Sequence, residues 1–126
     1  MLLIDTALQA LAIITEPERL VLLFGGVILG LIVGVIPGLS GVVALAILIP
    51  FTYGLDPYAA FALLIGKHAV TTNSDLIPAV LFGVPGTVGA AATVVDGHQM
   101  AKKGEAGRAF GAGYAASLIG GLAGAL

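Results

Sequence analysis

Long apolar runs dominate this chain of 126 residues, and short segments rich in glycine, proline and polar residues separate them. No Asp, Glu, Lys or Arg occurs between positions 20 and 55, or between positions 109 and 126. A soluble domain needs charged residues on its surface, whereas a helix that crosses a bilayer needs about 20 mainly apolar residues. The pattern therefore predicts an all-α integral membrane protein with multi-span helices.

The first two apolar runs predict two helices. Residues 2–14 form a weakly amphipathic apolar segment, either interfacial or the start of a span. A second helix is predicted to begin at Pro17, with Thr15 as its N-cap and Glu18 in the capping-box position, and to extend to Ile36. This helix nearly crosses a hydrocarbon core of about 30 Å.

Glycines recur at every fourth position of the second helix: Gly26, Gly30, Gly34 and Gly38. Residues four apart lie on one helix face, and glycines there let another helix approach closely. We therefore expect this stripe to be a packing face, although glycine is also common in membrane helices generally.

Two Gly/Pro-rich breaks interrupt the apolar pattern, at residues 37–41 and 83–87. Proline removes a backbone donor, and glycine admits conformations that are closed to other residues. A hydroxyl residue, Ser40 or Thr87, precedes the apolar run after each break. The sequence predicts that short helices follow over residues 41–49 and 88–95, so that both segments are discontinuous or re-entrant.

Between the breaks, Asp56 and Pro57 predict the start of a helix over residues 58–70. That helix carries Lys67, for which snorkelling to the interface is the expected behaviour, and His68, which we interpret as an interfacial or packed residue. Five polar residues, 71–75, are predicted to follow the helix. Such a cluster is costly at membrane depth unless it faces water, an ion or protein.

After another apolar run, at residues 76–82, the one strongly hydrophilic stretch lies at 96–105. It predicts a loop with a turn at Asp96-Gly97. A final span is predicted from Arg108 to Leu126. Three of the five basic residues lie in this region, so the positive-inside bias places the loop in the cytoplasm.

Composition excludes several classes of function. Only 10% of residues are charged and the net charge is −2, with no basic patch that would bind nucleic acid. Cysteine is absent, and the two histidines lie thirty residues apart. The sequence therefore predicts neither an enzyme nor a metal or cofactor site.

Three motifs resemble signatures of the large subunit of the tripartite tricarboxylate transporters, the TctA type. The first runs from Gly34 to Gly41 and continues over residues 48–57; the second covers residues 77–87 and 90–97; the third is residues 100–109. The resemblance covers about residue 20 to the end. One departure is at residues 71–75, where many members carry a Tyr-Gly-Gly-Ser-type stretch, so the substrate does not transfer with the resemblance.

The resemblance implies a permease subunit that imports small di- or tricarboxylates, driven by an ion gradient, with Na⁺ as the coupling ion. It also implies a small membrane subunit, an extracytoplasmic solute-binding protein and a multi-pass location in the inner (plasma) membrane. Because the family's permease is several times longer, residues 1–126 are expected to be a single membrane domain from its N-terminal portion.

The breaks are the predicted substrate site, because broken apolar segments mark midplane binding sites in transporters. A helix start leaves N–H groups unpaired and carries partial positive charge, which suits a carboxylate. The predicted substrate-binding residues are Pro37, Gly38, Ser40, Gly41, Pro85, Gly86 and Thr87. The predicted ion-binding residues are Thr71, Thr72, Asn73 and Ser74, whose oxygens are hard ligands.

Purely structural interpretations remain for the two breaks and for the polar cluster. The breaks are packing kinks if the chain is a non-transporting membrane scaffold or assembly subunit. The alternative for the cluster at residues 71–75 is a plain extramembrane loop.

Overall fold

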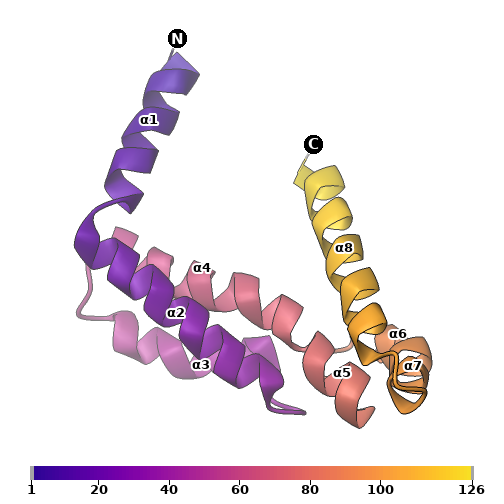
Figure 1. The fold of residues 1–126 in the computed structure, drawn as a ribbon. Helices are drawn as coiled ribbons and strands as arrows, with labels where there is room; N and C mark the ends of the chain where they lie inside the picture. Colours follow the sequence, from indigo (N-terminus) through magenta and orange to yellow (C-terminus); the bar gives the residue numbers. More distant parts are fainter. Residues whose placement is uncertain (1, 126) are drawn as a thin grey trace.

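The computed structural model describes residues 2–125, and the described part of the chain is helical without strands. Figure 1 shows a layer of α2, α3 and α4, from which α1 and α8 project at opposite ends. The elements are α1 (Leu2–Ile14), α2 (Pro17–Val35), α3 (Gly41–Leu48), a 3₁₀ turn (Ile49–Thr52), α4 (Pro57–Ser74), α5 (Leu76–Phe82), α6 (Ala91–Thr93), a π-helical turn (Val94–His98), α7 (Gln99–Lys102) and α8 (Ala106–Ala125). The predicted all-α class is confirmed.

The central contact is the close parallel packing of α2 on α4. Gly26, Gly30 and Gly34 are buried in it, and a Cβ added at any of them would strike α4, at Gly26 and Gly30 in its backbone. The reciprocal contact is Gly66 of α4, where an added Cβ would lie 2.5 Å from the Leu23 carbonyl oxygen. The predicted packing face is therefore confirmed for these three glycines, because only glycine permits backbones to approach so closely.

Polar contacts join the starts of α2 and α4. Arg19 lies 3.3 Å from the Asp56 carboxylate and 3.1 Å from Glu16, and its guanidinium carbon lies 5.1 Å from the centre of the Tyr58 ring. Asp56 also caps α4, accepting a hydrogen bond from the Ala59 N–H at 3.2 Å. Charges thus hold this end of the layer, and Asp56 caps α4, with Pro57 in its first turn, as predicted.

The predicted Thr15 cap of α2 is wrong. The N-cap is Glu16, with Pro17 in the first turn and no side-chain cap. The Thr15 hydroxyl lies 2.9 Å from the Leu11 carbonyl oxygen, and it therefore completes the end of α1 instead. Hydrogen bonding back to the preceding turn competes with capping for short hydroxyl side chains.

The chain reverses direction between α2 and α3, as Figure 1 shows. The Ser40 hydroxyl accepts a hydrogen bond from the Val43 N–H at 3.3 Å, so Ser40 is the N-cap of α3 as predicted. Gly38 has φ +83° in this connection and no atom near its Cβ position, so it does not extend the packing stripe.

The polar residues after position 70 do not end α4, contrary to prediction. The helix continues through Ser74 because its polar side chains bond to carbonyls within the helix or across to α2. The hydroxyls of Thr71 and Thr72 donate to carbonyls four residues earlier, at 2.8 and 3.1 Å. The Thr71 and Ser74 hydroxyls also lie 3.3 and 3.2 Å from the Gly30 carbonyl oxygen. Such back-bonding satisfies polar groups without interrupting a helix.

The structure after the second break also differs from the prediction, which was a short helix over residues 88–95. Residues 88–90 form a turn, α6 begins at Ala91 without a side-chain cap, and helical structure continues to Lys102. The predicted turn at Asp96-Gly97 is therefore wrong. Gly97 is buried, and a Cβ there would lie 3.1 Å from Val80 of α5.

The turn occurs instead at Gly104, which has φ +82°. The N–H of Glu105 donates to the carbonyl of Met100 at 2.9 Å, and the N–H of Gly104 donates to that of Ala101 at 3.0 Å. These two bonds form a Schellman motif, which ends a helix and favours glycine in the left-handed position.

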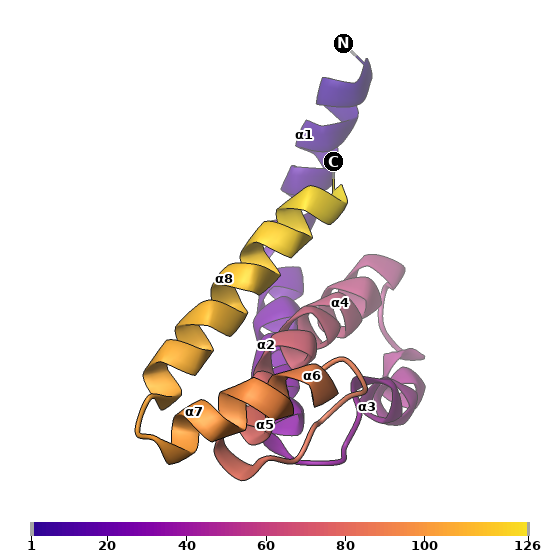
Figure 2. The ribbon, with the colours of Figure 1, turned by 90° about the vertical axis from the view of Figure 1, so that its right-hand side faces the viewer.

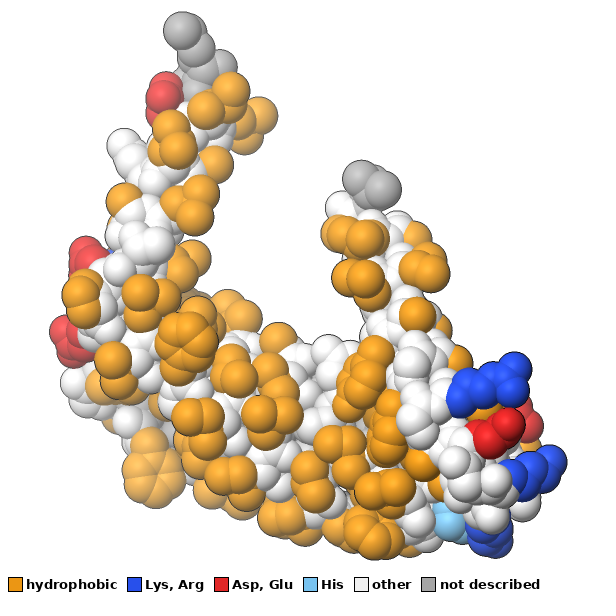
Figure 3. Space-filling view, viewed as in Figure 1, with side chains coloured by type: hydrophobic (Ala, Val, Ile, Leu, Met, Phe, Trp, Pro, Cys, Tyr) orange, Lys and Arg blue, Asp and Glu red, His pale blue; other side chains and the backbone are white. Residues whose placement is uncertain are grey.

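α8 follows this turn, two residues before the predicted Arg108, and Leu126 lies outside the described residues. Within residues 2–125, α2 is the helix with both the length and the apolar composition to cross a membrane; Leu3–Ile14 and Gly41–Thr52 are shorter apolar stretches. In Figure 3, apolar side chains cover much of the visible face, while lysine and arginine gather at the end formed by α7 and the start of α8.

Candidate functional site

The two breaks line one cavity of about 410 Å³, which we call the break cavity. Ser40 and Gly41 contribute from the start of α3, and Thr87 and Gly89 from the connection after α5. Its remaining lining residues are Val42, His68, Thr71, Thr72 and Val88. Figure 2 shows this second connection running back toward the start of α3 before α6 begins. Residues more than forty positions apart are therefore brought to one site.

Residues at the start of α3, where a helix has unpaired backbone donors, line this cavity. The first four N–H groups of a helix have no partner within it. Ser40 satisfies one of them, through its hydroxyl to Val43, while its carbonyl accepts the first intrahelical hydrogen bond from the Ala44 N–H. The N–H groups of Gly41 and Val42 remain, and both residues line the break cavity. Their position at a helix N-terminus suits an anionic group.

Lys67 holds the first break in position, although it does not itself line the break cavity. Its side chain is fully buried, and its ammonium Nζ donates a hydrogen bond to the Gly41 carbonyl. The predicted snorkelling is therefore wrong. The glycine stripe of α2 lies against the α4 backbone at Lys67, so the side chain is enclosed rather than directed to an interface.

Asp75 fixes the second break. Its side chain is buried, with only 6% of the residue exposed, at the junction of α4 and α5. The Thr87 hydroxyl donates to its Oδ2 at 2.5 Å. Gly86 packs against it, since an added Cβ would lie 2.8 Å from the Asp75 Cβ. Because Thr87 bonds to Asp75, it does not cap a helix, and the predicted helix start at Thr87 is wrong.

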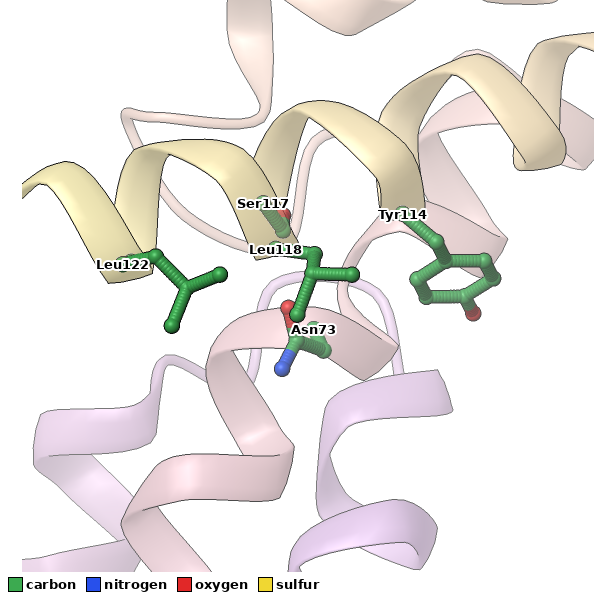
Figure 4. A pocket seen from close by; sticks show the side chains of 6 residues that line it. Asn73, Tyr114, Ser117, Leu118 and Leu122 are labelled. Atoms are coloured by element: carbon green, nitrogen blue, oxygen red, sulfur yellow. The ribbon is translucent and has the colours of Figure 1, made fainter.

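A second cavity, of about 390 Å³, includes Asp75 in its lining and shares Thr72, Thr87 and Gly89 with the break cavity; we call it the Asp75 cavity. Thr72 and Asn73 line it from α4, and Ser117 lines it from α8. Asn73 and Ser117 also line a neighbouring pocket of about 510 Å³ between α4 and α8. Figure 4 shows Asn73 lying beneath Ser117 and Leu118 in that pocket.

The predicted site residues thus separate into three groups. Ser40, Gly41, Thr71, Thr72 and Thr87 line the break cavity. Asn73 lines the Asp75 cavity, together with Thr72 and Thr87. Pro37, Gly38 and Pro85 are exposed in the connections, Gly86 is buried beside Asp75, and Ser74 is buried against Gly34.

The sequence analysis did not assign Lys67 to the site, and it placed Asp75 in the polar cluster at residues 71–75 without naming it as a ligand. The available signal was their charge within otherwise apolar segments, because intramembrane ionisable residues usually face the protein interior or a cavity. Each is held by a break that lies more than ten residues away, and no local pattern specifies that pairing.

Comparisons with known proteins match nearly the whole chain. A family model described as the tripartite tricarboxylate transporter TctA family matches residues 20–126. A protein of Agrobacterium vitis, described as an uncharacterized 52.8 kDa protein in the TAR-I ttuC' 3' region, is 35% identical over 105 residues. That alignment covers 83% of this chain and 21% of the relative, so the chain spans about one fifth of the relative's length. No solved structure matches.

Proposed function

Since the chain belongs to the tripartite tricarboxylate transporter TctA family, we propose that it is part of a permease that imports small di- or tricarboxylates through the break cavity. The observation that carries this proposal is the convergence of both Gly/Pro breaks on one cavity. Its volume of about 410 Å³ lies within the range of about 300–1,000 Å³ that is typical of small-molecule sites.

The chemistry of the break cavity suits a carboxylate. The free N–H groups of Gly41 and Val42 lie at the positive end of α3, and hydroxyls of Ser40 and Thr72 are near. Lys67 adds a buried positive charge behind Gly41, although it does not line the cavity. Backbone and hydroxyl donors without a direct ion pair bind an anion weakly enough for release, which transport requires.

We propose that the permease spans the inner membrane several times, as a single membrane domain in this region. Its partners would be a small membrane subunit and an extracytoplasmic solute-binding protein, with a Na⁺ gradient as the energy source. α2 supports the membrane part of this proposal, as do the large apolar side chains exposed along α1 and α8. Family membership supports the partners.

The test is carboxylate uptake by the full-length permease together with its partner subunits. Gly89 lines the break cavity, has no positive φ, and has only the Thr87 hydroxyl, at 3.8 Å, near its Cβ position. Gly89→Leu therefore fills the cavity without straining the backbone. We expect the apparent KM for the carboxylate to rise about tenfold or more, equivalent to a loss of about 1.4 kcal/mol of binding.

Gly107→Leu is the matched control, because Gly107 is exposed and no atom lies within 4 Å of its Cβ position. Gly38 and Gly86 are poor test positions, since one has φ +83° and the other packs on Asp75. If Gly89→Leu and Gly107→Leu take up carboxylate equally well, the breaks are packing features, as expected of a scaffold subunit.

A further inference from the structure

Asp75 is a buried carboxylate without a positive partner. Among residues 2–125, no lysine, arginine or histidine forms an ion pair with it, and its one side-chain hydrogen bond is from Thr87 to Oδ2. No described group donates to Oδ1, and no side-chain oxygen among these residues is both buried and without a partner, so Oδ1 keeps accessible surface. A buried charge is costly unless it is paired or coordinates a metal ion. Among residues 2–125, no positive charge neutralises this carboxylate, so its site is open to a cation.

The surroundings of Asp75 offer oxygen ligands of the right kind. Its cavity of about 390 Å³ is also lined by Thr72, Asn73, Thr87 and Ser117, and by Thr93. Hydroxyl oxygens keep lone pairs when they donate a hydrogen bond, and the Asn73 side chain carries an amide oxygen. Carboxylate, hydroxyl and amide oxygens are ligands for hard cations.

The charge count selects a monovalent ion. Asp75 is the single carboxylate among the residues that line this cavity. One positive charge neutralises it, whereas a divalent ion would leave a buried excess charge. We propose that the Asp75 carboxylate, with Thr87 as a second ligand, holds the Na⁺ ion that couples to transport. This inference rests on the proposed function and moves the ion site from residues 71–74 to Asp75.

Thr87 connects this ion to the substrate site. It lines both cavities, and its hydroxyl is bonded to Asp75. A cation at Asp75 fixes the position of the second break, which forms one wall of the break cavity. Sodium bound at Asp75 therefore favours the conformation that binds carboxylate, and by linkage the carboxylate raises the affinity for sodium.

The first experiment measures sodium binding without transport. The full-length permease is purified in detergent, and its thermal unfolding is followed in NaCl and in KCl at equal ionic strength. We expect Na⁺ to raise the Tm by a few degrees, because a ligand that binds only the folded state stabilises it. Asp75→Asn should abolish this shift, since the amide keeps an oxygen for the Thr87 hydroxyl but loses the charge.

Asp96→Asn is the matched control, because Asp96 is an exposed aspartate on the neighbouring π-helical turn. It should keep the sodium-dependent shift. If Asp75→Asn fails to fold, Thr87→Val replaces it, and we expect its half-saturating Na⁺ concentration to rise at least tenfold. The proposal is overturned if the folded variant shows the same Na⁺-dependent Tm shift as wild type. It is also overturned if the Tm of the wild-type protein responds to pH and not to Na⁺.

The second experiment separates this inference from the proposed function. Uptake of a labelled carboxylate is measured against Na⁺ concentration for wild-type and Asp75→Asn assemblies. If wild type transports and the variant keeps the same sodium dependence, the ion site is wrong and the proposed function stands. A wild-type protein that shows the Na⁺-dependent Tm shift but no carboxylate uptake supports the site and overturns the function.

Discussion

Because α2 packs closely on α4, alanine substitutions at two glycines of α2 should have opposite effects on the stability of the protein. At Gly30, an added Cβ would meet the Lys67 carbonyl oxygen and would lie 3.1 Å from the Lys67 Cα. It would also disturb the Gly30 carbonyl, which the Thr71 and Ser74 hydroxyls approach. At Gly25, no atom lies within 4 Å of the Cβ position. We therefore compare Gly30→Ala with Gly25→Ala.

The expected free-energy changes follow from two terms. Replacing a glycine in a helix interior by alanine stabilises the helix by about 0.5–1 kcal/mol, and this term applies to both variants. Overpacking a close contact costs about 1–3 kcal/mol. The atoms that the new methyl at Gly30 would strike belong to the backbone and cannot rotate away, so the cost lies near the upper value. Gly30→Ala should lose about 2 kcal/mol, while Gly25→Ala gains up to about 1 kcal/mol.

The assay is thermal unfolding of the full-length permease in detergent, with each variant compared with wild type. We expect the Tm of Gly30→Ala to fall and that of Gly25→Ala to stay the same or rise. Gly66→Ala, on the α4 side, should resemble Gly30→Ala, because its Cβ would lie 2.5 Å from the Leu23 carbonyl oxygen. Equal shifts for Gly30→Ala and Gly25→Ala, or a more stable Gly30→Ala protein, would refute packing through this stripe.

Two further predictions concern the membrane. The chain should stay with membranes after alkaline carbonate extraction, because α2 and its neighbours expose large apolar side chains; recovery in the soluble fraction would contradict the transporter proposal. The turn at 103–105 should be cytoplasmic, because Lys102, Lys103 and Arg108 are exposed beside it. Single cysteines at Gln99 or Glu105 should resist an impermeant reagent added to intact cells, and labelling from outside would reverse the orientation.

Local chemistry explains which elements were predictable. Ser40 and Asp56 cap the helices that follow them, because a short acceptor side chain before an apolar run satisfies N–H groups nearby. The spacing of Gly26, Gly30 and Gly34 requires only the helical period. These features depend on residues within one or two turns, so the sequence displays them directly.

Predictions failed where a distant contact decided the structure. Residues 71–74 were predicted to leave the helix because they are polar, but α2 supplies the Gly30 carbonyl that receives two of their hydroxyls. Asp96-Gly97 has a turn sequence, yet Gly97 is buried against α5 and His98 Nδ1 lies 3.0 Å from the Val80 carbonyl oxygen. Tertiary packing overrides turn preference in both places.

The breaks were predicted as a site from their own residues, but the structure attaches both of them to α4. Lys67 holds the first break through the Gly41 carbonyl, and Asp75, directly after the helix, holds the second through Thr87. Eight residues separate the two charges, which corresponds to about 12 Å along a helix. α4 is in turn packed on α2 through glycines, which leave little room for it to shift. In the proposed mechanism, a change in charge at Asp75 acts on the second break relative to a fixed first break, and this difference would couple the proposed ion to the shape of the break cavity.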